Sequence, residues 1–224
     1  MQSRYARNIP ALSEEECLLL REKRVLVVGC GGLGGHIIDQ LARIGIGYLR
    51  VVDGDVFEAS NLNRQLLSSV PLLGTGKAKA AADHIARVNP EITVDAADVF
   101  LTEANAAKLV EGCDIVMDAL DNITGRKILA AACAEAGIPY VYGAIQGWVV
   151  QAAVSLPEDQ LMEILYPEET EISDKSVLSF TPALCASFQT SLCVKFLLGR
   201  PVETGTVYYF DLLDLEYETI PLLG

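Results

Sequence analysis

The feature that most constrains the fold is a glycine-rich stretch, RVLVVGCGGLGG, at residues 24–35. A valine-rich run followed by glycines is typical of a strand, a tight turn and the start of a helix. Gly29, Gly31 and Gly34 have G-x-G-x-x-G spacing, which permits the turn and lets the backbone approach a phosphate. N–H groups at the helix start would face that anion. The stretch predicts a nucleotide-binding turn without identifying the nucleotide, and a turn that only packs a helix also fits.

The residues after the glycines predict a βαβ unit. A helix over 32–44 ends at Gly45, which suits a left-handed cap, and a second strand follows over 48–53. The crossover rule makes the two strands parallel. Asp53 ends the second strand, where an acidic side chain contacts ribose hydroxyls in doubly wound folds. This arrangement fits NAD and ATP equally.

The remaining patterns predict an α/β fold: a doubly wound, Rossmann-like, mostly parallel sheet with an antiparallel C-terminal extension. Ser13 and Glu16 form a capping box before the first helix. Helices are expected over residues 14–23, 32–44, 77–88, 102–111, 123–136 and 181–198. Strands are expected over residues 25–29, 48–53, 92–99, 113–120, 140–143, 148–156, 207–213 and 215–220.

The length of 224 residues favours one large α/β domain spanning 1–224 rather than two domains. Residues 1–23 are expected to form an N-terminal arm and helix outside the sheet. Residues 157–179 are acidic, contain two prolines and lack clear periodicity. Such stretches inside compact domains are usually lids or binding loops, so this segment is expected to be a crossover loop.

Composition limits the expected partners and location. The formal net charge of −13 argues against nucleic acid or an anionic membrane surface as a partner. There is no apolar run of the length that a membrane span needs and no signal-peptide pattern at the start. We therefore expect a cytoplasmic protein. The six cysteines form no C-x-x-C pair, so we expect reduced thiols and no zinc site.

Charged side chains follow the predicted strand ends. Asn61, Arg64 and Lys77 come after the second strand, and Asp118 and Asp121 follow a later one. Ligands of such folds lie outside the carboxyl ends of the strands. The cations suit a triphosphate, and carboxylates beside phosphates are best explained by a Mg²⁺ ion between them. The set predicts phosphoryl or nucleotidyl transfer.

Each of these residues also fits a simpler role when taken alone. Lys77 opens an alanine-rich helix and fits a solvated position there, while Asp121 and Asn122 suit the N-cap of the next helix. His36 and His84 have no serine or cysteine at an informative spacing, which argues against a histidine-based nucleophilic mechanism.

Six short motifs occur in order along residues 4–220. They are R-Y-x-R-N-I at 4–9, G-C-G-G-L-G-G at 29–35, V-D-G-D at 52–55, S-N-L-N-R-Q at 60–65, G-x-x-K ending at Lys77, and D-x-x-D-N-x-x-x-R at 118–126. Together they resemble the ThiF/MoeB/HesA family, bacterial relatives of ubiquitin-activating enzymes. That family uses ATP to adenylate the C-terminal glycine carboxylate of a ubiquitin-like protein. This partner is typically a sulfur carrier for thiamine, molybdopterin or related syntheses.

The resemblance implies a role for individual residues. Asp53 would hold the ribose, Asp121 would bind Mg²⁺, and Arg7 would reach from the arm into a second protomer's site, which implies a homodimer. The residues expected to act in catalysis are Arg7, Arg64, Lys77 and Asp121. The residues expected to bind nucleotide are Gly29, Gly31, Gly32, Gly34, Asp53, Asp55, Asn61, Arg64, Lys77 and Asn122.

The chemistry agrees with these roles. A carboxylate that attacks the α-phosphorus brings an anion onto a polyanion, so catalysis must come from positioning and from cations. The attacking carboxylate is already ionised near neutral pH, so no protein base is needed.

Two departures from the family pattern bear on the reaction. Many relatives have two C-x-x-C pairs that bind zinc, and some have a reactive cysteine in the crossover loop; this sequence has neither, and Cys185 lies just beyond the loop in a predicted helix. We therefore expect a compact, zinc-free member that forms the acyl-adenylate and leaves sulfur delivery to another protein.

The family resemblance implies a ubiquitin-like carrier protein ending in Gly-Gly as the substrate. Adenylation of a small-molecule carboxylate remains an alternative, as does an NAD-dependent oxidoreductase, which only the glycines and Asp53 favour. A non-catalytic scaffold is disfavoured because every position of the expected nucleotide site has the residue that the family pattern has there.

Overall fold

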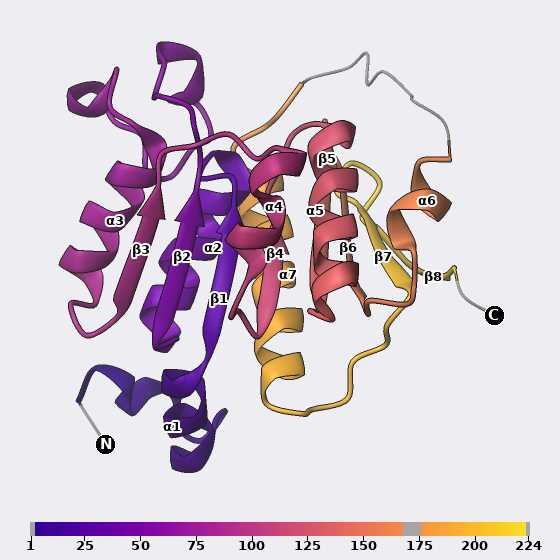
Figure 1. Cartoon of the computed structure of the whole chain (residues 1–224), viewed down its shortest axis with the longest axis horizontal. Helices are drawn as coiled ribbons and strands as arrows, with labels where there is room; N and C mark the ends of the chain where they lie inside the picture. The colour runs from indigo at the N-terminus through magenta and orange to yellow at the C-terminus, as the bar shows by residue number, and fades with distance from the viewer. Residues whose placement is uncertain (1–2, 168–175, 223–224) are drawn as a thin grey trace.

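A computed structural model of the protein describes residues 3–167 and 176–222. Its eight described strands form a sheet in the order β3-β2-β1-β4-β5-β6-β7-β8 (Figure 1). The pairs from β3 through to β5 are parallel, and β6, β7 and β8 are added antiparallel. The expected fold class is therefore confirmed.

The elements alternate along the chain as a doubly wound fold requires. The strands are β1 (Arg24–Val28), β2 (Tyr48–Val52), β3 (Thr93–Ala97), β4 (Ile115–Asp118), β5 (Tyr140–Gln146), β6 (Val149–Ser155), β7 (Thr206–Asp211) and β8 (Glu216–Pro221). The α-helices are α1 (Glu14–Glu22), α2 (Gly32–Ile44), α3 (Lys77–Val88), α4 (Glu103–Val110), α5 (Ile123–Ala136), α6 (Leu161–Leu165) and α7 (Phe180–Leu197). Short 3₁₀ helices are η1 (Ser3–Asn8), η2 (Ala59–Asn61) and η3 (Val70–Leu72).

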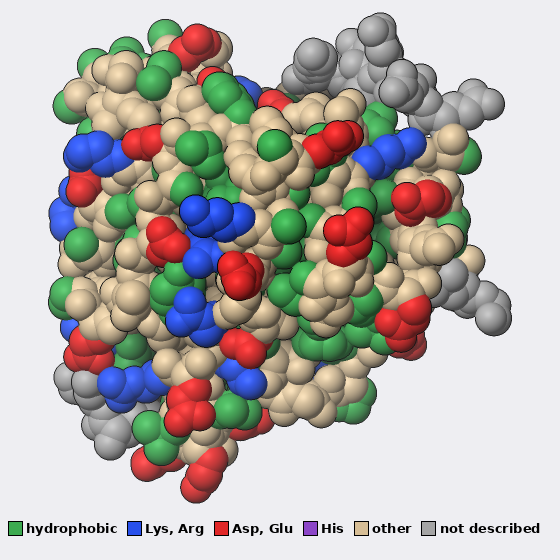
Figure 2. Space-filling model, in the orientation of Figure 1, with side chains coloured by type: hydrophobic (Ala, Val, Ile, Leu, Met, Phe, Trp, Pro, Cys, Tyr) green, Lys and Arg blue, Asp and Glu red, His purple; other side chains and the backbone are tan. Residues whose placement is uncertain are grey.

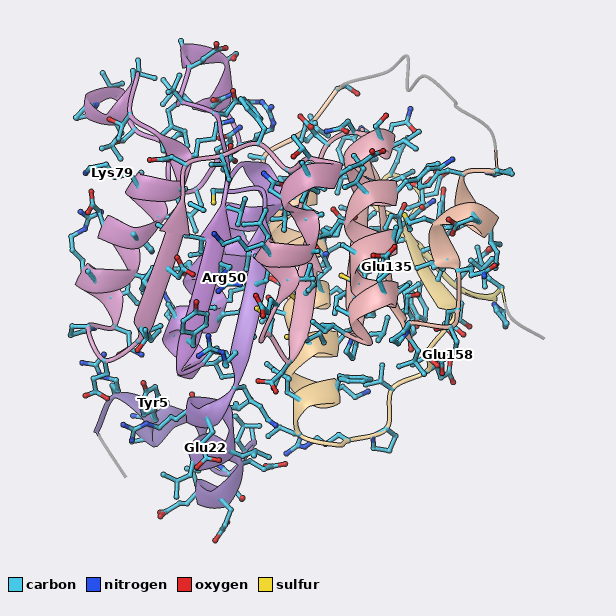
Figure 3. All side chains as sticks on the ribbon, viewed as in Figure 1. Tyr5, Glu22, Arg50, Lys79, Glu135 and Glu158 are labelled. Atoms are coloured by element: carbon cyan, nitrogen blue, oxygen red, sulfur yellow. The ribbon has the colours of Figure 1, made fainter. Side chains whose placement is uncertain are left out.

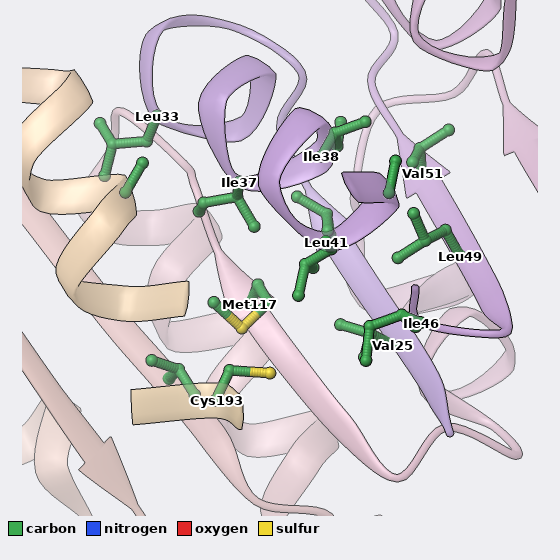
Figure 4. Close-up of a cluster of buried hydrophobic side chains, with 14 of the residues drawn as sticks. Val25, Leu33, Ile37, Ile38, Leu41, Ile46, Leu49, Val51, Met117 and Cys193 are labelled. Atoms are coloured by element: carbon green, nitrogen blue, oxygen red, sulfur yellow. The ribbon is translucent and has the colours of Figure 1, made fainter. Parts of the chain in front are cut away.

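Helices cover both faces of the sheet. In Figure 1, α4 and α5 lie in front of it, and α2 and α7 lie behind it. Residues of α2, α3 and α7 form one buried cluster with the sheet, and residues of α4, α5 and α6 form a second. Figure 4 shows part of the first cluster, in which Ile37 and Leu41 of α2 lie near Val25 and Met117, all four fully buried. Removal of this apolar surface from water stabilises the layered arrangement.

Local sequence signals place several helix ends correctly. The capping box is present, because the Ser13 hydroxyl accepts from the Glu16 N–H and the Ser13 N–H donates to the Glu16 carboxylate. Gly45 caps α2 with a φ of 99°, in the left-handed region that glycine adopts readily. The bounds of α2, α3 and α5 agree with the sequence-based expectation.

Several predicted segments differ from the structure; the strand expected over 140–143, for example, extends to Gln146. The strand expected over 113–120 ends at Asp118, because its carboxylate accepts a hydrogen bond from the Leu120 N–H and turns the chain. The expectation that residues 157–179 lack regular structure is wrong for α6, whose Leu161 and Met162 are buried. Residues 168–175 of that expected loop lie outside the described residues.

The N-terminal arm packs at the amino ends of the strands. Tyr5 is buried, and its hydroxyl accepts from the Asn89 amide at the end of α3 at 2.7 Å. The Asn8 amide donates to the Ile44 carbonyl at the end of α2. Figure 3 shows Tyr5 below the C-terminal end of α3 and Lys79 beside the start of that helix.

Acidic and basic side chains are interspersed on the face shown in Figure 2. Arg50, which Figure 3 labels near the middle of this face, pairs with Asp95 at 2.8 Å and donates to carbonyls at the end of α4. None of the described helices has both the length and the apolar character that crossing a membrane requires.

Candidate active site

The glycine turn lies at the carboxyl edge, by which we mean the edge of the sheet where β1, β2 and β4 end. Gly29 has a φ of 96°, and a Cβ on Gly34 would lie 1.7 Å from the Gly29 carbonyl oxygen, so both positions require glycine. Gly31 is the N-cap of α2 and has no side chain to bind its first N–H groups, which are left for an anion. A Cβ on Gly32 would make only ordinary contacts, so glycine is not sterically required there.

Asp53 connects the turn to the end of β2. One carboxylate oxygen accepts from the Cys30 N–H at 2.7 Å and the other from the Asp55 N–H at 2.8 Å. Burial raises the pKa of Asp53, because the charged form loses water, while these N–H groups and the positive charge of Lys77 oppose the rise. Asp53 is only partly buried, so its oxygens remain within reach of a ligand hydroxyl.

Lys77 presents an ammonium group at the start of α3. Its Nζ lies 2.9 Å from Asp55 Oδ2, and its own N–H donates to the Asp55 carbonyl. The exposures of the two side chains are unequal, at 8% for Lys77 and 59% for Asp55. A buried cation paired with an exposed carboxylate can exchange that carboxylate for a phosphate at little cost.

The segment around η2 holds Arg64. Its guanidinium donates to the Ser60 carbonyl at 3.0 Å and to Asn63 Oδ1 at 2.9 Å. Asn61 is buried, and its Oδ1 accepts from the Glu58 N–H at 3.0 Å. Asn61 therefore shapes this turn, while Arg64 is the partly exposed cation that the turn presents.

The acid pair expected at the end of β4 is divided between two roles. Asp121 is exposed, whereas Asp118 is fully buried and pairs with Arg126 at 2.8 Å. The interpretation of Asp118 as part of a metal anchor is wrong, because its carboxylate is sealed from the carboxyl edge and already occupied. Asn122 caps α5 by accepting from the Gly125 N–H at 2.7 Å, as its simpler role predicts.

Contacts between loops bring these groups together. A Cβ on Gly29 would lie 2.5 Å from the carbonyl oxygen of Ala119, two residues before Asp121. The same turn bonds to Asp53, and a Cβ on Gly31 would meet the Gln65 amide at 3.3 Å. The glycine turn is thus the common neighbour of the segments that follow β2 and β4.

Comparison with known proteins identifies the family. The model of the protein family described as "ThiF family" matches residues 5–223 of the chain. The chain belongs to the ThiF family. This confirms the resemblance found in the sequence motifs.

Relatives of this ThiF-family protein include the SAMP-activating enzyme E1 of Haloferax volcanii, 36% identical over 97% of this chain and 84% of that protein. The molybdopterin-synthase adenylyltransferase of Escherichia coli is 31% identical over 91% of this chain and 85% of that protein. The crystal structure of E. coli MccB with ATP has a TM-score of 0.83 over 99% of this chain and 72% of that chain, at 20% identity, which shows a shared fold.

The chain is shorter than several other relatives. It spans 60% of the probable adenylyltransferase/sulfurtransferase MoeZ of Mycobacterium tuberculosis, and about half of the Xenopus laevis and Zea mays proteins named adenylyltransferase and sulfurtransferase. The expected enzyme class, a nucleotidyltransferase, is confirmed by the word adenylyltransferase in the names of several of these relatives.

In the structure of this chain, Arg7 lies away from the residues grouped at the carboxyl edge. Arg7 belongs to η1, which contacts the C-terminal ends of α2 and α3 (Figures 1 and 3). The start of α2 is at the glycine turn, and its 13 residues extend about 20 Å. Arg7 therefore cannot reach the carboxyl edge of its own chain.

The cysteines are packing residues in the structure. All six are buried and unpaired by disulfides. Burial raises the pKa of Cys185 to about 12, which keeps it as a thiol and removes it as an acceptor. Within residues 3–167 and 176–222, no group of three or more His, Cys, Asp or Glu side chains is arranged to hold a metal.

Sequence reasoning missed two buried polar residues beside the site. Arg126 closes the D-x-x-D-N-x-x-x-R motif, and its eight-residue spacing from Asp118 was the available signal. Gln65 follows Arg64 in its motif; it is 7% exposed, and its Oε1 has no hydrogen-bond partner among the described residues. A buried amide oxygen without a donor is unusual and lies next to the glycine turn.

Proposed function

We propose that this protein uses ATP to adenylate the C-terminal carboxylate of a ubiquitin-like sulfur-carrier protein, with release of pyrophosphate. The names of the archaeal E1 and the bacterial molybdopterin-synthase adenylyltransferase support this substrate class. The observation that carries the proposal is that three groups lie together at the carboxyl edge: the buried ammonium group of Lys77, the Asp53 carboxylate at the end of β2, and the free N–H groups at the start of α2.

The proposed roles follow from burial and charge. The N–H groups at the start of α2 bind a phosphate, and Asp53 accepts from ribose hydroxyls. Lys77 and Arg64 place positive charge where the transition state gathers negative charge. The carrier carboxylate is already ionised near neutral pH, so no protein base takes part.

Asp121 is the residue proposed to bind Mg²⁺. It is an exposed carboxylate that accepts only from the Asn122 amide among the described residues, at 3.2 Å. One carboxylate fits, because Mg²⁺ usually takes one or two protein carboxylates together with substrate phosphates and water. When bound, the ion would neutralise phosphate charge.

Arg7 is proposed to act in the site of a second protomer. Its position at the opposite end of its own sheet supports a contribution in trans, as the family resemblance implies. A homodimer with twofold symmetry would then contain two shared sites.

The test is exchange of labelled pyrophosphate into ATP. We expect exchange only with Mg²⁺ and a carrier protein ending in Gly-Gly. Asp121→Asn should lower the rate by about 100-fold or more, because it removes the charge that holds the ion. Asp214→Asn, in the exposed turn after β7, is the matched control and should retain full exchange. Tight NAD binding without exchange for any carrier would instead support an oxidoreductase.

A further inference from the structure

Behind the carboxyl edge lies a buried ion pair that the proposed reaction does not use. Asp118 Oδ2 and Arg126 Nη1 are 2.8 Å apart, with the two side chains 0% and 6% exposed. The Tyr140 hydroxyl also donates to Asp118 Oδ2. A buried pair of this kind is weak evidence for stability, because desolvation of both charges offsets their attraction. The contacts of the pair are instead those of a group that positions the neighbouring backbone.

Arg126 and Asp118 together hold the backbone just before Asp121. Arg126 Nη2 donates to the Leu120 carbonyl oxygen, and the Leu120 N–H donates to Asp118 Oδ1 at 2.9 Å. Arg126 Nη1 also donates to the Gly143 carbonyl of β5 at 2.6 Å. Both polar groups of Leu120 are thus bound to one rigid pair, and the next residue is Asp121.

The pair is connected to α6 through two tyrosines. The Arg126 guanidinium carbon lies 5.1 Å from the centre of the buried Tyr142 ring. The Tyr142 hydroxyl lies 2.7 Å from the Tyr166 hydroxyl and donates to Gln151 at 3.2 Å. Either hydroxyl can be the donor in the contact between Tyr142 and Tyr166.

Tyr166 is the C-cap of α6, at the point where the chain leaves this helix. Its ring meets the Tyr142 ring edge-to-face at 6.5 Å, and it is only partly buried. A continuous set of contacts therefore runs from the end of α6 to the turn that presents Asp121.

We propose that Arg126 and Tyr166 are positioning residues that fix the Asp121 carboxylate for Mg²⁺, Arg126 directly through Leu120 and Tyr166 through Tyr142 and Arg126. The inference rests on the proposed function, because it assigns Asp121 to the ion. It also connects the crossover segment to the metal-binding carboxylate, so that the place of α6 affects how ATP and Mg²⁺ bind.

The test measures the dissociation constant of ATP by calorimetry, with Mg²⁺ and with EDTA. Tyr166→Phe keeps the ring contact and removes one hydroxyl. We expect it to weaken ATP binding about 2- to 10-fold with Mg²⁺, the effect of one hydrogen bond, and to leave binding in EDTA unchanged. Tyr217→Phe is the matched control, because Tyr217 is 54% exposed and its ring contact with Phe210 does not involve the hydroxyl. It should change neither value.

Two further measurements separate positioning from simple structural support. In an Asp121→Asn background, Tyr166→Phe should have no further effect on ATP binding, because it acts through Asp121. In the free protein, amide hydrogen exchange of residues 119–123 should become about 2- to 10-fold faster in Tyr166→Phe and in Arg126→Lys. Tyr166→Phe keeps the proposal testable if Arg126→Lys does not fold.

Equal weakening of ATP binding with Mg²⁺ and with EDTA, additivity with Asp121→Asn, or unchanged hydrogen exchange would each overturn the inference. Normal Mg²⁺-dependent ATP binding without pyrophosphate exchange for any carrier would overturn the proposed function alone. Wild-type protein that binds no ATP would overturn both.

Discussion

Replacement of Lys77 by methionine should separate the proposed role of its charge in adenylation from its role in stability. Methionine has a similar length and an apolar end, so it fills the buried space that the lysine stem occupies. Lys77 is 8% exposed and its partner Asp55 is 59% exposed. The substitution therefore leaves the freed carboxylate in water, where an unpaired charge costs little.

The two effects have different expected sizes. Methionine fills the space of the buried lysine stem and the freed Asp55 carboxylate stays solvated, so losing the pair should cost no more than losing a surface ion pair. Lys77→Met should therefore change the free energy of unfolding by about 1 kcal/mol or less. A unit charge about 4 Å from a phosphate, in an effective dielectric of about 20, contributes about 4 kcal/mol. Part of that charge already interacts with Asp55, so we expect pyrophosphate exchange to fall about 10²–10³-fold.

Urea unfolding and pyrophosphate exchange measure the two quantities on the same preparation. Lys79→Met is the matched control, because Lys79 lies two residues along α3, is 65% exposed, and pairs with Asp83 within the helix. Lys79→Met should leave both the free energy of unfolding and the rate of pyrophosphate exchange unchanged. The reasoning is refuted if Lys77→Met keeps more than half of the exchange rate, or if it lowers the free energy of unfolding by more than about 3 kcal/mol.

Two further predictions concern assembly and the thiols. When Arg7→Ala and Asp121→Ala subunits are refolded together, half of the dimers should be mixed and contain one intact site, so activity should recover to roughly a quarter of wild type. If mixed dimers form and activity does not recover, the shared site is rejected. All six cysteines are buried, and burial raises the pKa of Cys185 to about 12, so native protein should not react with a thiol reagent at pH 8. Urea-unfolded protein should react at six sites, and rapid labelling of the native protein would contradict the prediction.

Local patterns along the chain were sufficient to predict the fold. The helices beginning at Gly32, Lys77 and Ile123 have the expected bounds, because their caps and apolar periodicity depend only on nearby residues. The motif spacing likewise predicted which residues follow the strands at the carboxyl edge. These signals are local, and the crossover rule converts them into a parallel sheet.

Tertiary structure decided what each charged residue does. Asp118 and Asp121 are equivalent carboxylates in the sequence, but one faces the layer under α5 and is buried with Arg126, while the other extends into solvent. The order of residues along the chain does not show whether a side chain at the end of a strand will be buried or exposed after the layers pack. Only the family resemblance pointed to Arg7 acting outside its own chain, because its distance from the carboxyl edge depends on the length of α2 and on where the arm docks. Burial and distance arise only when the layers pack, and they determine which charges remain available to a ligand.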